Sequence, residues 1–549
     1  MKVADFFCGA GGFSEGFRIA GFDVVFSADN WGPAVITHTK NHPEWPTKKV
    51  DIELLSKLPD DEFHNIVPDT DVIIGSPPCV AFSNSNKSGK ADKSLGIRLF
   101  EAYLRIIARK KFKKNSVLKY WILENVPNAS EFLKSHYTAQ DLELDGNFIL
   151  EVKSNSSGIY NSKYYGVAQN RRRYFCGEFP KPQETILNDE EVIPLSFILR
   201  SLNKVQGEIK DPNYPELKML DRKINDHFYV KELADFEWKK AKKAKRDKGY
   251  MGKMAFPESL DKPSRTIMAT LSYSSRESHI YKIDNEKDRY RTPTIREAAS
   301  IMSFPIDYKF YGDTKATKHK LVGNAVPPKL AYAFAKEIIQ TEGEQIPPYP
   351  KTSFRQKKDE EFVNLNYNTF PVNIEKRKNL KKARYKYHIP YLILNTYRVE
   401  LTNYNSDFEN EKIKWTVELH KSQGAANKRV YTPGINYISN LDLIIRKKIE
   451  KFLKRIQNEI VNPNQFQEFY CMTSIERKEN EFMGPDELLE EIKKFIEEIN
   501  INDEELSVKI KDDGDELTVP WKIAIGYFIL FRVVEEMNLR AKSNLLSNV

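Results

Sequence analysis

The hydrophobic positions of the first 180 residues fall into short apolar runs separated by amphipathic stretches. The runs predict strands at Val3–Phe7, Val24–Ala28, Val72–Gly75, Tyr120–Glu124 and Arg173–Gly177. Apolar residues at helical spacing between them predict helices at Ser14–Ala20, Ala34–His38 and Ile97–Lys111. This alternation is typical of an α/β protein with a parallel, doubly wound sheet. Since ligands of such sheets bind beyond the carboxyl ends of the strands, we expect functional residues there.

The pattern changes after residue 180. Residues 181–290 are charged and rich in turn-forming residues, and helical periodicity returns at Thr294–Phe304 and Leu330–Ile339. We therefore predict that residues 1–180 form an α/β domain that residues 291–343 complete. A small irregular domain at 181–290 interrupts it.

A proline-rich stretch, Pro347-Pro348-Tyr349-Pro350, indicates a second boundary. Residues 344–385 are predicted to be a linker, and residues 386–549 a separate α+β domain. Its expected strands are Tyr391–Glu400 and Lys412–Leu419. Three amphipathic helices should follow, with apolar positions at Leu441–Ile456, Leu488–Ile499 and 521–538.

The bulk composition is that of a folded, multidomain protein. The chain has 549 residues, of which 40% are hydrophobic, and its net charge of +9 permits a polyanionic partner without requiring one. The longest apolar run, Ile523–Val534, is shorter than a membrane span and contains Arg532. The four cysteines lie far apart with no C-x-x-C pair. We therefore expect no zinc site, no membrane association and a reducing, cytoplasmic compartment.

A glycine-rich turn follows the first predicted strand. Asp5-Phe6-Phe7-Cys8-Gly9-Ala10-Gly11-Gly12 leads directly into a helix. Glycines let backbone amides approach a nucleotide-like ligand, and the helix N-terminus points toward it. The spacing differs from the G-x-G-x-x-G of dinucleotide-binding proteins.

Further motifs follow the later strands. They are Gly75-Ser76-Pro77-Pro78-Cys79, Glu124-Asn125-Val126, Gln169-Asn170-Arg171-Arg172-Arg173 and Gly323-Asn324-Ala325-Val326-Pro327-Pro328. An isolated cysteine is usually a small buried hydrophobe. A thiol on a rigid proline turn, beside a glycine loop and an acid at the next strand end, favours a nucleophile. On an extended strand Arg171 and Arg173 face one way and Arg172 the other.

This ordered set of motifs resembles the cytosine-5 DNA methyltransferases over roughly the first 340 residues. The resemblance implies a Rossmann-like, S-adenosylmethionine-dependent methyltransferase domain, with residues 181–290 as the target-recognition domain. In that family a cysteine thiolate, here Cys79, attacks C6 of a cytosine flipped out of duplex DNA, and C5 takes the methyl group. Glu124 would stabilise N3 of the base, Arg173 would contact the base, and Arg171 would line its surroundings.

The resemblance also implies which residues hold S-adenosylmethionine. Phe7 would pack on the adenine, Asp29 would bind the ribose hydroxyls, and Asp51 would meet the adenine edge. Asn30 stands where the family often has a stacking aromatic residue, and Trp31 comes one place later. The full implied set is Phe7, Gly9, Gly11, Gly12, Asp29, Asn30, Asp51, Ile52, Pro78, Asn324 and Ala325.

Double-stranded DNA is the partner that the resemblance implies. The polar, basic stretch after Cys79 suits a lid that closes on DNA. Thr270-Leu271 matches a Thr-Leu pair of the family's target-recognition region. The expected DNA-binding residues are Ser83, Lys87, Gln169, Arg265, Thr270 and Leu271.

The C-terminal third lies outside the resemblance. Glu418-Leu419-His420-Lys421 and Asp407-Phe408-Glu409 leave a metal-dependent nuclease open, but the spacing is not the usual D…E-x-K. Because the region is rich in acids and lysines, we interpret these charges as solvated and predict no metal site. Assistance in DNA binding, or recruitment of a partner such as a cognate restriction endonuclease, is the leading hypothesis.

The resemblance and the Lys/Asn/Ile-rich composition favour a monomeric bacterial enzyme of a restriction-modification or phage-defence system, associated with the nucleoid. Two alternatives stay open. A tRNA methyltransferase of the same mechanism would have a much reduced recognition region, whereas 181–290 is long. A DNA-binding module with a degenerate methyltransferase part would not be expected to keep Cys79, Glu124 and Arg173.

Overall fold

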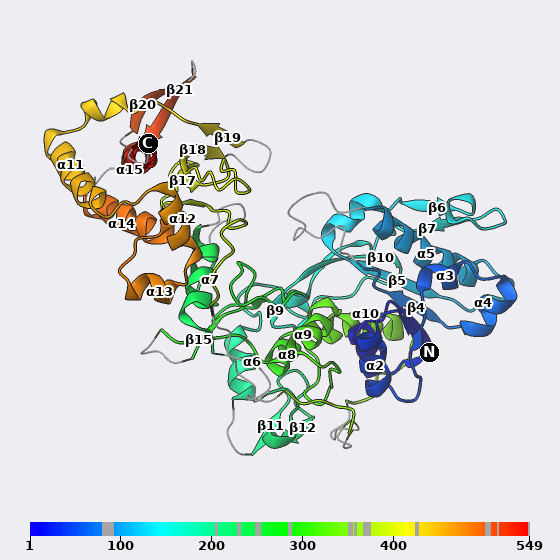
Figure 1. The fold of residues 1–549 in the computed structure, drawn as a ribbon. Coiled ribbons are helices and arrows are strands. Elements are labelled where there is room, and N and C mark those ends of the chain that lie inside the picture. Colours follow the sequence, from blue (N-terminus) through cyan, green and yellow to red (C-terminus); the bar gives the residue numbers. More distant parts are fainter. Residues whose placement is uncertain are drawn as a thin grey trace. The chain divides into compact units, whose positions relative to one another are not determined.

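The computed structural model describes the chain in two compact units. The first contains residues 1–233, 257–273 and 277–370, and the second contains 234–256, 274–276 and 371–549 (Figure 1). The described residues are 1–549 without 79–92, 204–206, 228–231, 248–253, 284–287, 350–354, 356–358, 366–374, 423–427, 500–506, 513–514 and 547–549.

A seven-stranded sheet with the order β3-β2-β1-β4-β5-β10-β8 forms the centre of the first unit. Neighbouring strands from β3 to β5 are parallel, and β10 is antiparallel to both β5 and β8. The predicted doubly wound α/β fold is confirmed. The strands are β1 (Lys2–Phe6), β2 (Asp23–Asp29), β3 (Lys48–Lys49), β4 (Val72–Gly75), β5 (Tyr120–Asn125), β8 (Gly158–Asn161) and β10 (Arg172–Glu178).

The prediction of a parallel sheet is wrong at β10. A parallel return requires a crossover, usually a helix. The chain between β5 and β10 instead forms short 3-10 turns, the hairpin of β6 (His136–Thr138) and β7 (Ile149–Glu151), and β8. Tyr174 of β10 pairs with Asn125 at the end of β5. The start of β10 therefore lies at the edge of the sheet where β4 and β5 end.

Alternate residues of β4 face two hydrophobic cores. Val72 and Ile74 belong to the core that contains α1 (Gly12–Ile19) and α10 (Pro328–Thr341), whereas Ile73 belongs to the core with α5 (Ser94–Lys111). Apolar residues on both faces are expected for strands covered by helices on both sides. The last helix of the unit, α10, thus returns to the first sheet, as the sequence predicted.

The remaining elements of the first unit are short. A further core joins α6, β11 and β12 to the helices α8 and α9. These elements are α2 (Gly32–Asn41), α3 (Ile52–Ser56), α4 (Asp60–Ile66), β9 (Gln169–Asn170), α6 (Leu195–Leu202), β11 (Glu208–Lys210), β12 (Lys218–Leu220), β13 (Ser264–Arg265), β14 (Tyr281–Lys282), β15 (Tyr290–Arg291), α8 (Ile295–Ile301) and α9 (Lys315–Asn324).

Part of the predicted linker packs on the first unit. The ring of Tyr349 stacks on Tyr214 with centroids 4.7 Å apart. The guanidinium of Arg355 is buried, with Nη2 2.7 Å from Glu15 Oε2 and Nη1 3.0 Å from Asp307 Oδ1. Because Glu15 lies on α1, this segment is anchored to the helix that follows the glycine-rich turn. The four predicted domain boundaries stay a prediction.

The second unit is an α+β domain, as predicted. Its four-stranded antiparallel sheet has the order β16 (Lys386–His388), β17 (Tyr397–Thr402), β18 (Thr416–Ser422) and β19 (Lys428–Tyr431). A hairpin of β20 (Ser507–Asp512) and β21 (Asp515–Pro520) precedes the last helix. The helices are α11 (Leu443–Gln457), α12 (Pro463–Cys471), α13 (Ser474–Glu479), α14 (Pro485–Glu498) and α15 (Trp521–Leu546).

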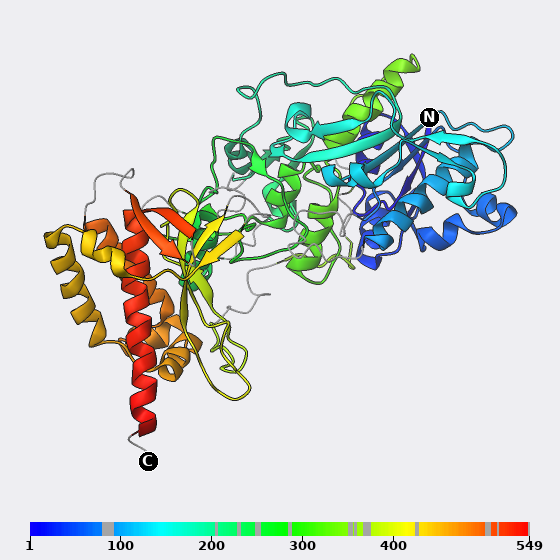
Figure 2. The same cartoon turned by 90° about the horizontal axis from the view of Figure 1, so that it is seen from above.

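The long helix α15, red in Figure 2, packs against β17 and β18. Its buried residues, such as Ile525 and Leu530, share one hydrophobic core with Val399, Leu401 and Leu419 of the two strands. In the described part of the chain, none of the helices combines the length and the apolar character that crossing a membrane requires.

A helix from the region predicted to recognise the target, α7 (Asp235–Asp247), belongs to the second unit. Lys243 Nζ lies 2.8 Å from Asp486 Oδ1 and stacks 3.6 Å from the ring centroid of Tyr387. Tyr385 donates a second hydrogen bond to Asp486 at 3.0 Å. Asp486 lies at the start of α14, so α7 is part of the C-terminal fold.

Candidate active site

The ends of β4 and β5 and the start of β10 bring three polar side chains together. Ser76 Oγ donates a hydrogen bond to Glu124 Oε2, and Arg173 Nε lies 3.2 Å from Glu124 Oε1. Glu124 is only 4% exposed, so the arginine compensates a charge that is shielded from water. We call Ser76, Glu124 and Arg173 the strand-end site.

The turn that leads to Cys79 is tied to the same edge of the sheet. Asn125 Nδ2, next to Glu124, donates to the carbonyl oxygen of Pro77 at 2.8 Å. The structure therefore brings together Glu124, Arg173 and the turn, as the family resemblance implies. Cys79 itself, with Ser83 and Lys87, lies outside the described residues.

Arg171 has a different environment from Arg173. Its side chain is 1% exposed, and its Nη2 donates to the carbonyl oxygens of Gly323 and Ala325, both at 3.0 Å. Nη1 donates to the carbonyl oxygen of Ile267 at 3.3 Å. Arg171 thus joins the start of β10 to the Gly323–Pro328 motif, and its catalytic role stays a prediction.

The predicted DNA-binding residues that the structure describes lie around β9 and β13. Gln169 is fully buried, and neither Nε2 nor Oε1 has a hydrogen-bond partner within the described residues. Arg265 forms a bidentate pair with Glu258, at 2.9 and 2.7 Å. Thr270 and Leu271 line a small pocket that also includes His319. DNA contacts from these residues stay predictions.

The glycine-rich turn has room for a ligand at Gly9. Gly9 has a φ of +54°, and a Cβ placed there would have no heavy atom within 4 Å. At Gly12, by contrast, a Cβ would lie 2.1 Å from the carbonyl oxygen of Val326. Gly9 therefore leaves backbone open to a close approach, and the absence of a side chain at Gly12 makes room for the Gly323–Pro328 motif. Contact of this turn with the amino-acid end of S-adenosylmethionine stays a prediction.

Two acids predicted to bind the cofactor also shape the backbone. Asp29 accepts hydrogen bonds from the N–H groups of Gly9 at 3.0 Å and Trp31 at 2.8 Å, and burial raises its pKa. Asp51 caps α3 through the N–H of Glu53 at 2.8 Å. Cofactor contacts stay a prediction for the whole set. Asn30, Pro78 and Asn324 are exposed, Phe7 is half-buried, and Ile52, Gly11 and Ala325 are buried.

A buried network of polar side chains lies next to the glycine-rich turn. Ser14 Oγ donates to Asp5 Oδ2 at 2.6 Å, and His38 Nε2 lies 2.9 Å from Ser14 Oγ. Burial raises the pKa of Asp5 to about 8 and lowers the pKa of His38 to about 3. Both side chains are therefore mainly uncharged at neutral pH. Sequence reasoning missed this network, because only the fold brings His38 to Asp5.

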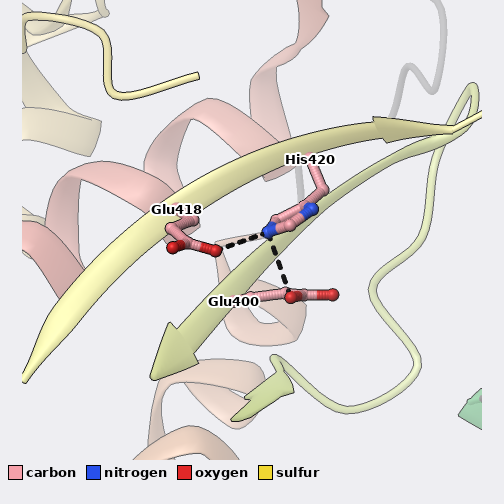
Figure 3. A group of neighbouring side chains, drawn as sticks. All are labelled: Glu400, Glu418 and His420. Atoms are coloured by element: carbon pink, nitrogen blue, oxygen red, sulfur yellow. Dashed lines mark hydrogen bonds and ion pairs between the residues drawn. The ribbon is translucent and has the colours of Figure 1, made fainter. Parts of the chain in front are cut away.

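A second polar cluster lies on β17 and β18 of the other unit (Figure 3). Glu400 pairs in register with Glu418, and His420 Nε2 lies 2.8 Å from Glu418 Oε2 and 3.0 Å from Glu400 Oε2. The sequence analysis singled out Glu418 and His420 but missed Glu400. Asp407 bonds to Asn410 instead and is not in this cluster. We call Glu400, Glu418 and His420 the strand-pair site.

The family model described as C-5 cytosine-specific DNA methylase matches residues 1–340. Among curated proteins, the type II methyltransferase M.MthTI of Methanothermobacter thermautotrophicus is 31% identical over 361 residues, which are 62% of this chain and 97% of that protein. M.FnuDI of Fusobacterium nucleatum is 28% identical over 366 residues, with 62% and 95% coverage. M.HindV of Haemophilus influenzae is 29% identical over 351 residues, with 63% and 99% coverage. These relatives are matched almost entirely, whereas a large part of this chain is not.

Proposed function

The chain belongs to the family of C-5 cytosine-specific DNA methylases, and we propose that Cys79 and Glu124 carry out its reaction. The enzyme transfers a methyl group from S-adenosylmethionine to C5 of cytosine in DNA. The observation that supports these roles is the strand-end site. Glu124 contacts Ser76, three residues before Cys79, and also Arg173, so that acid, cation and the turn before the thiol share one sheet edge.

We propose the following steps. The target cytosine leaves the stack, because a thiol cannot reach C6 inside a duplex. The Cys79 thiolate forms an S–C6 bond, and a proton shared between the Glu124 carboxyl group and N3 stabilises the negative charge that develops on the ring. C5, now nucleophilic, would take the methyl group that S-adenosylmethionine supplies, and S-adenosylhomocysteine would remain. Loss of the C5 proton to water and cleavage of the S–C6 bond would then restore the aromatic ring and the thiolate.

Other residues would bind the cofactor and the DNA or hold neighbouring parts of the site in position. The cofactor supplies an electrophilic methyl group, and Gly9 with Asp29 offers it an open backbone and a carboxylate. Arg171 would act as a positioning residue, since it holds the carbonyls of Gly323 and Ala325. Phe7, Asn30, Asp51, Ile52, Pro78 and Asn324 complete the proposed cofactor set, and Ser83, Lys87, Gln169, Arg265, Thr270 and Leu271 the proposed DNA set.

We further propose a role in restriction-modification or phage defence, supported by relatives that are named type II methyltransferases. The family's DNA substrate supports this over the tRNA alternative. The enzyme would act as a monomer on chromosomal DNA in a bacterial cytoplasm. The C-terminal unit would assist DNA binding or recruit a cognate endonuclease.

The roles are tested by labelled methyl transfer to duplex DNA. Cys79→Ala should abolish transfer while binding of the cofactor persists, and Cys471→Ala, in the other unit, should retain transfer. Methyl transfer by Cys79→Ala at the wild-type rate would refute the assignment of Cys79 as the nucleophile. Bisulfite sequencing of DNA from cells that express the protein would give the target sequence.

A further inference from the structure

The sheet of the second unit has one apolar and one polar face. Val399, Leu401 and Leu419 point into the core beneath α15. Because side chains alternate along a strand, the intervening Glu400 and Glu418 point to the opposite face, together with His420. This face holds a cluster that the methyltransfer reaction does not use.

One oxygen of this cluster lacks a donor. Glu400 has a side-chain exposure of 9%, and its Oε1 accepts from Arg398 Nε at 2.6 Å. Its Oε2 has no hydrogen bond within the described residues. The nearby donors are already committed, since His420 Nε2 bonds to Glu418 at 2.8 Å and Lys386 Nζ bonds to Glu418 at 2.6 Å.

Leaving a buried carboxylate oxygen without a partner is unfavourable. His420 Nε2 lies 3.0 Å from Glu400 Oε2, but its hydrogen bond is to Glu418, so His420 does not satisfy both glutamates. Lys386 Nζ is 3.5 Å from Glu400 Oε2, beyond good hydrogen-bond distance. Although donors lie close by, Glu400 Oε2 therefore has no hydrogen bond within the described residues.

We propose that Glu400, Glu418 and His420 bind one divalent transition-metal ion, although the sequence alone predicts no metal site. Their donor atoms all lie within 4.8 Å of one another. Adjacent ligands of an octahedral ion with bonds of about 2.1 Å lie about 3 Å apart, as the two histidine–glutamate distances do. An ion between them would give Glu400 Oε2 its missing partner.

The donor set selects the class of ion. Two carboxylates suit Mg²⁺ and Mn²⁺, whereas an imidazole suits Zn²⁺, Fe²⁺ and related ions. Mn²⁺ and Zn²⁺ accept both kinds of ligand. Lys386, whose side chain is 33% exposed, can turn toward solvent when the ion replaces its contact with Glu418.

Mn²⁺ is the probe that tests this site. The full-length chain, freed of metal with EDTA, is titrated with Mn²⁺ and followed by electron paramagnetic resonance. One ion should bind per chain, and its spectrum should show coupling to an imidazole nitrogen. Glu400→Gln and His420→Gln should each weaken binding at least about tenfold, and His420→Gln should remove the nitrogen coupling.

The matched control is Glu459→Gln, an exposed acid in the turn after α11 in the same unit, which should bind as the wild type does. Absence of stoichiometric binding by the wild type would overturn the proposal. So would a bound Mn²⁺ without imidazole coupling, a result that needs no folded variant. Unchanged binding by Glu400→Gln would also overturn it.

Discussion

The strand-end site and the strand-pair site both hold a buried glutamate beside side chains that can carry positive charge. The two glutamates differ in how many of their carboxylate oxygens have a partner. Each carboxylate oxygen of Glu124 has a partner, Ser76 for one and Arg173 for the other. Glu400 has a partner for one oxygen and no hydrogen bond for the other. A fully partnered acid is held in one orientation for a reaction, whereas a partly partnered one has capacity left for a ligand.

The two sites also differ in how they are assembled. The strand-end site is assembled by the doubly wound topology, which makes β4, β5 and the start of β10 meet at one edge. The strand-pair site is assembled by the register of two neighbouring antiparallel strands. Fold topology thus positions the first site, and local pairing the second.

The largest expected effect is at Glu124. Glu124→Gln keeps the size of the side chain and removes its acid, so methyl transfer should fall by about 10²- to 10⁴-fold, the usual worth of general acid–base catalysis. Steady-state labelling of duplex DNA measures it. Glu131→Gln, an exposed acid on the turn after β5, should keep full activity. Equal rates for the two variants would contradict a catalytic role for Glu124.

The next effect concerns a buried charge pair outside both sites. Arg355→Met removes the buried cation that lies 2.7 Å from Glu15 Oε2 and 3.0 Å from Asp307 Oδ1, and should lower the free energy of unfolding by about 3 kcal/mol. Urea denaturation of the full chain measures this. Lys119→Met breaks the exposed pair with Glu342 and should leave stability unchanged. Arg355→Met with wild-type stability would contradict the view that this buried ion pair stabilises the first unit.

A smaller effect sharpens the difference between the sites. If Glu400 has spare capacity, Mn²⁺ at about 100 times its dissociation constant should stabilise the second unit by up to about 2.7 kcal/mol. Thermal unfolding with Mn²⁺ and with EDTA gives the shift. Glu400→Gln should show none of it, whereas Glu124→Gln should show all of it. The same shift in both variants would mean that the ion binds elsewhere.

The last prediction is that a substitution in the strand-pair site leaves the rate of methyl transfer unchanged. Because the proposed reaction does not involve the strand-pair site, Glu400→Gln should transfer methyl groups at the wild-type rate with or without EDTA. The labelling assay used for Glu124→Gln measures it. A fall in the methyl-transfer rate of more than about tenfold would show that the strand-pair site also contributes to methyl transfer, and would contradict the separation of the two sites.

The sequence predicted the elements well where the hydrophobic pattern had clear ends. β4 matches Val72–Gly75 because the apolar run stops at a Ser-Pro-Pro turn. The strand predicted to begin at Tyr391 begins at Tyr397 instead. Tyr391, Asn395 and Thr396 have positive φ values, a turn geometry that propensity does not reveal.

The residues of the candidate sites were likewise predictable only where a local motif marks them. Glu124 was predictable because it stands in a motif at the carboxyl end of a strand. The proximity of Arg173 followed from the family resemblance and not from the strand pattern, because β10 begins there and runs antiparallel to β5. Glu400 was not predictable, since its partnership with Glu418 depends on strand register across a loop. Arg355 pairs with Glu15 across 340 residues, and no local pattern indicates such a contact.

The central claim is that the Cys79 sulfur adds to the ring of an extruded cytosine. It is tested most directly with a random-sequence duplex library that contains 5-fluoro-2′-deoxycytidine, incubated with the enzyme and S-adenosylmethionine. Fluorine at C5 cannot leave as a proton, so the account predicts a protein–DNA adduct that survives denaturation and maps to Cys79 by mass spectrometry. An adduct at another residue, or none from an enzyme that methylates ordinary DNA, would contradict it.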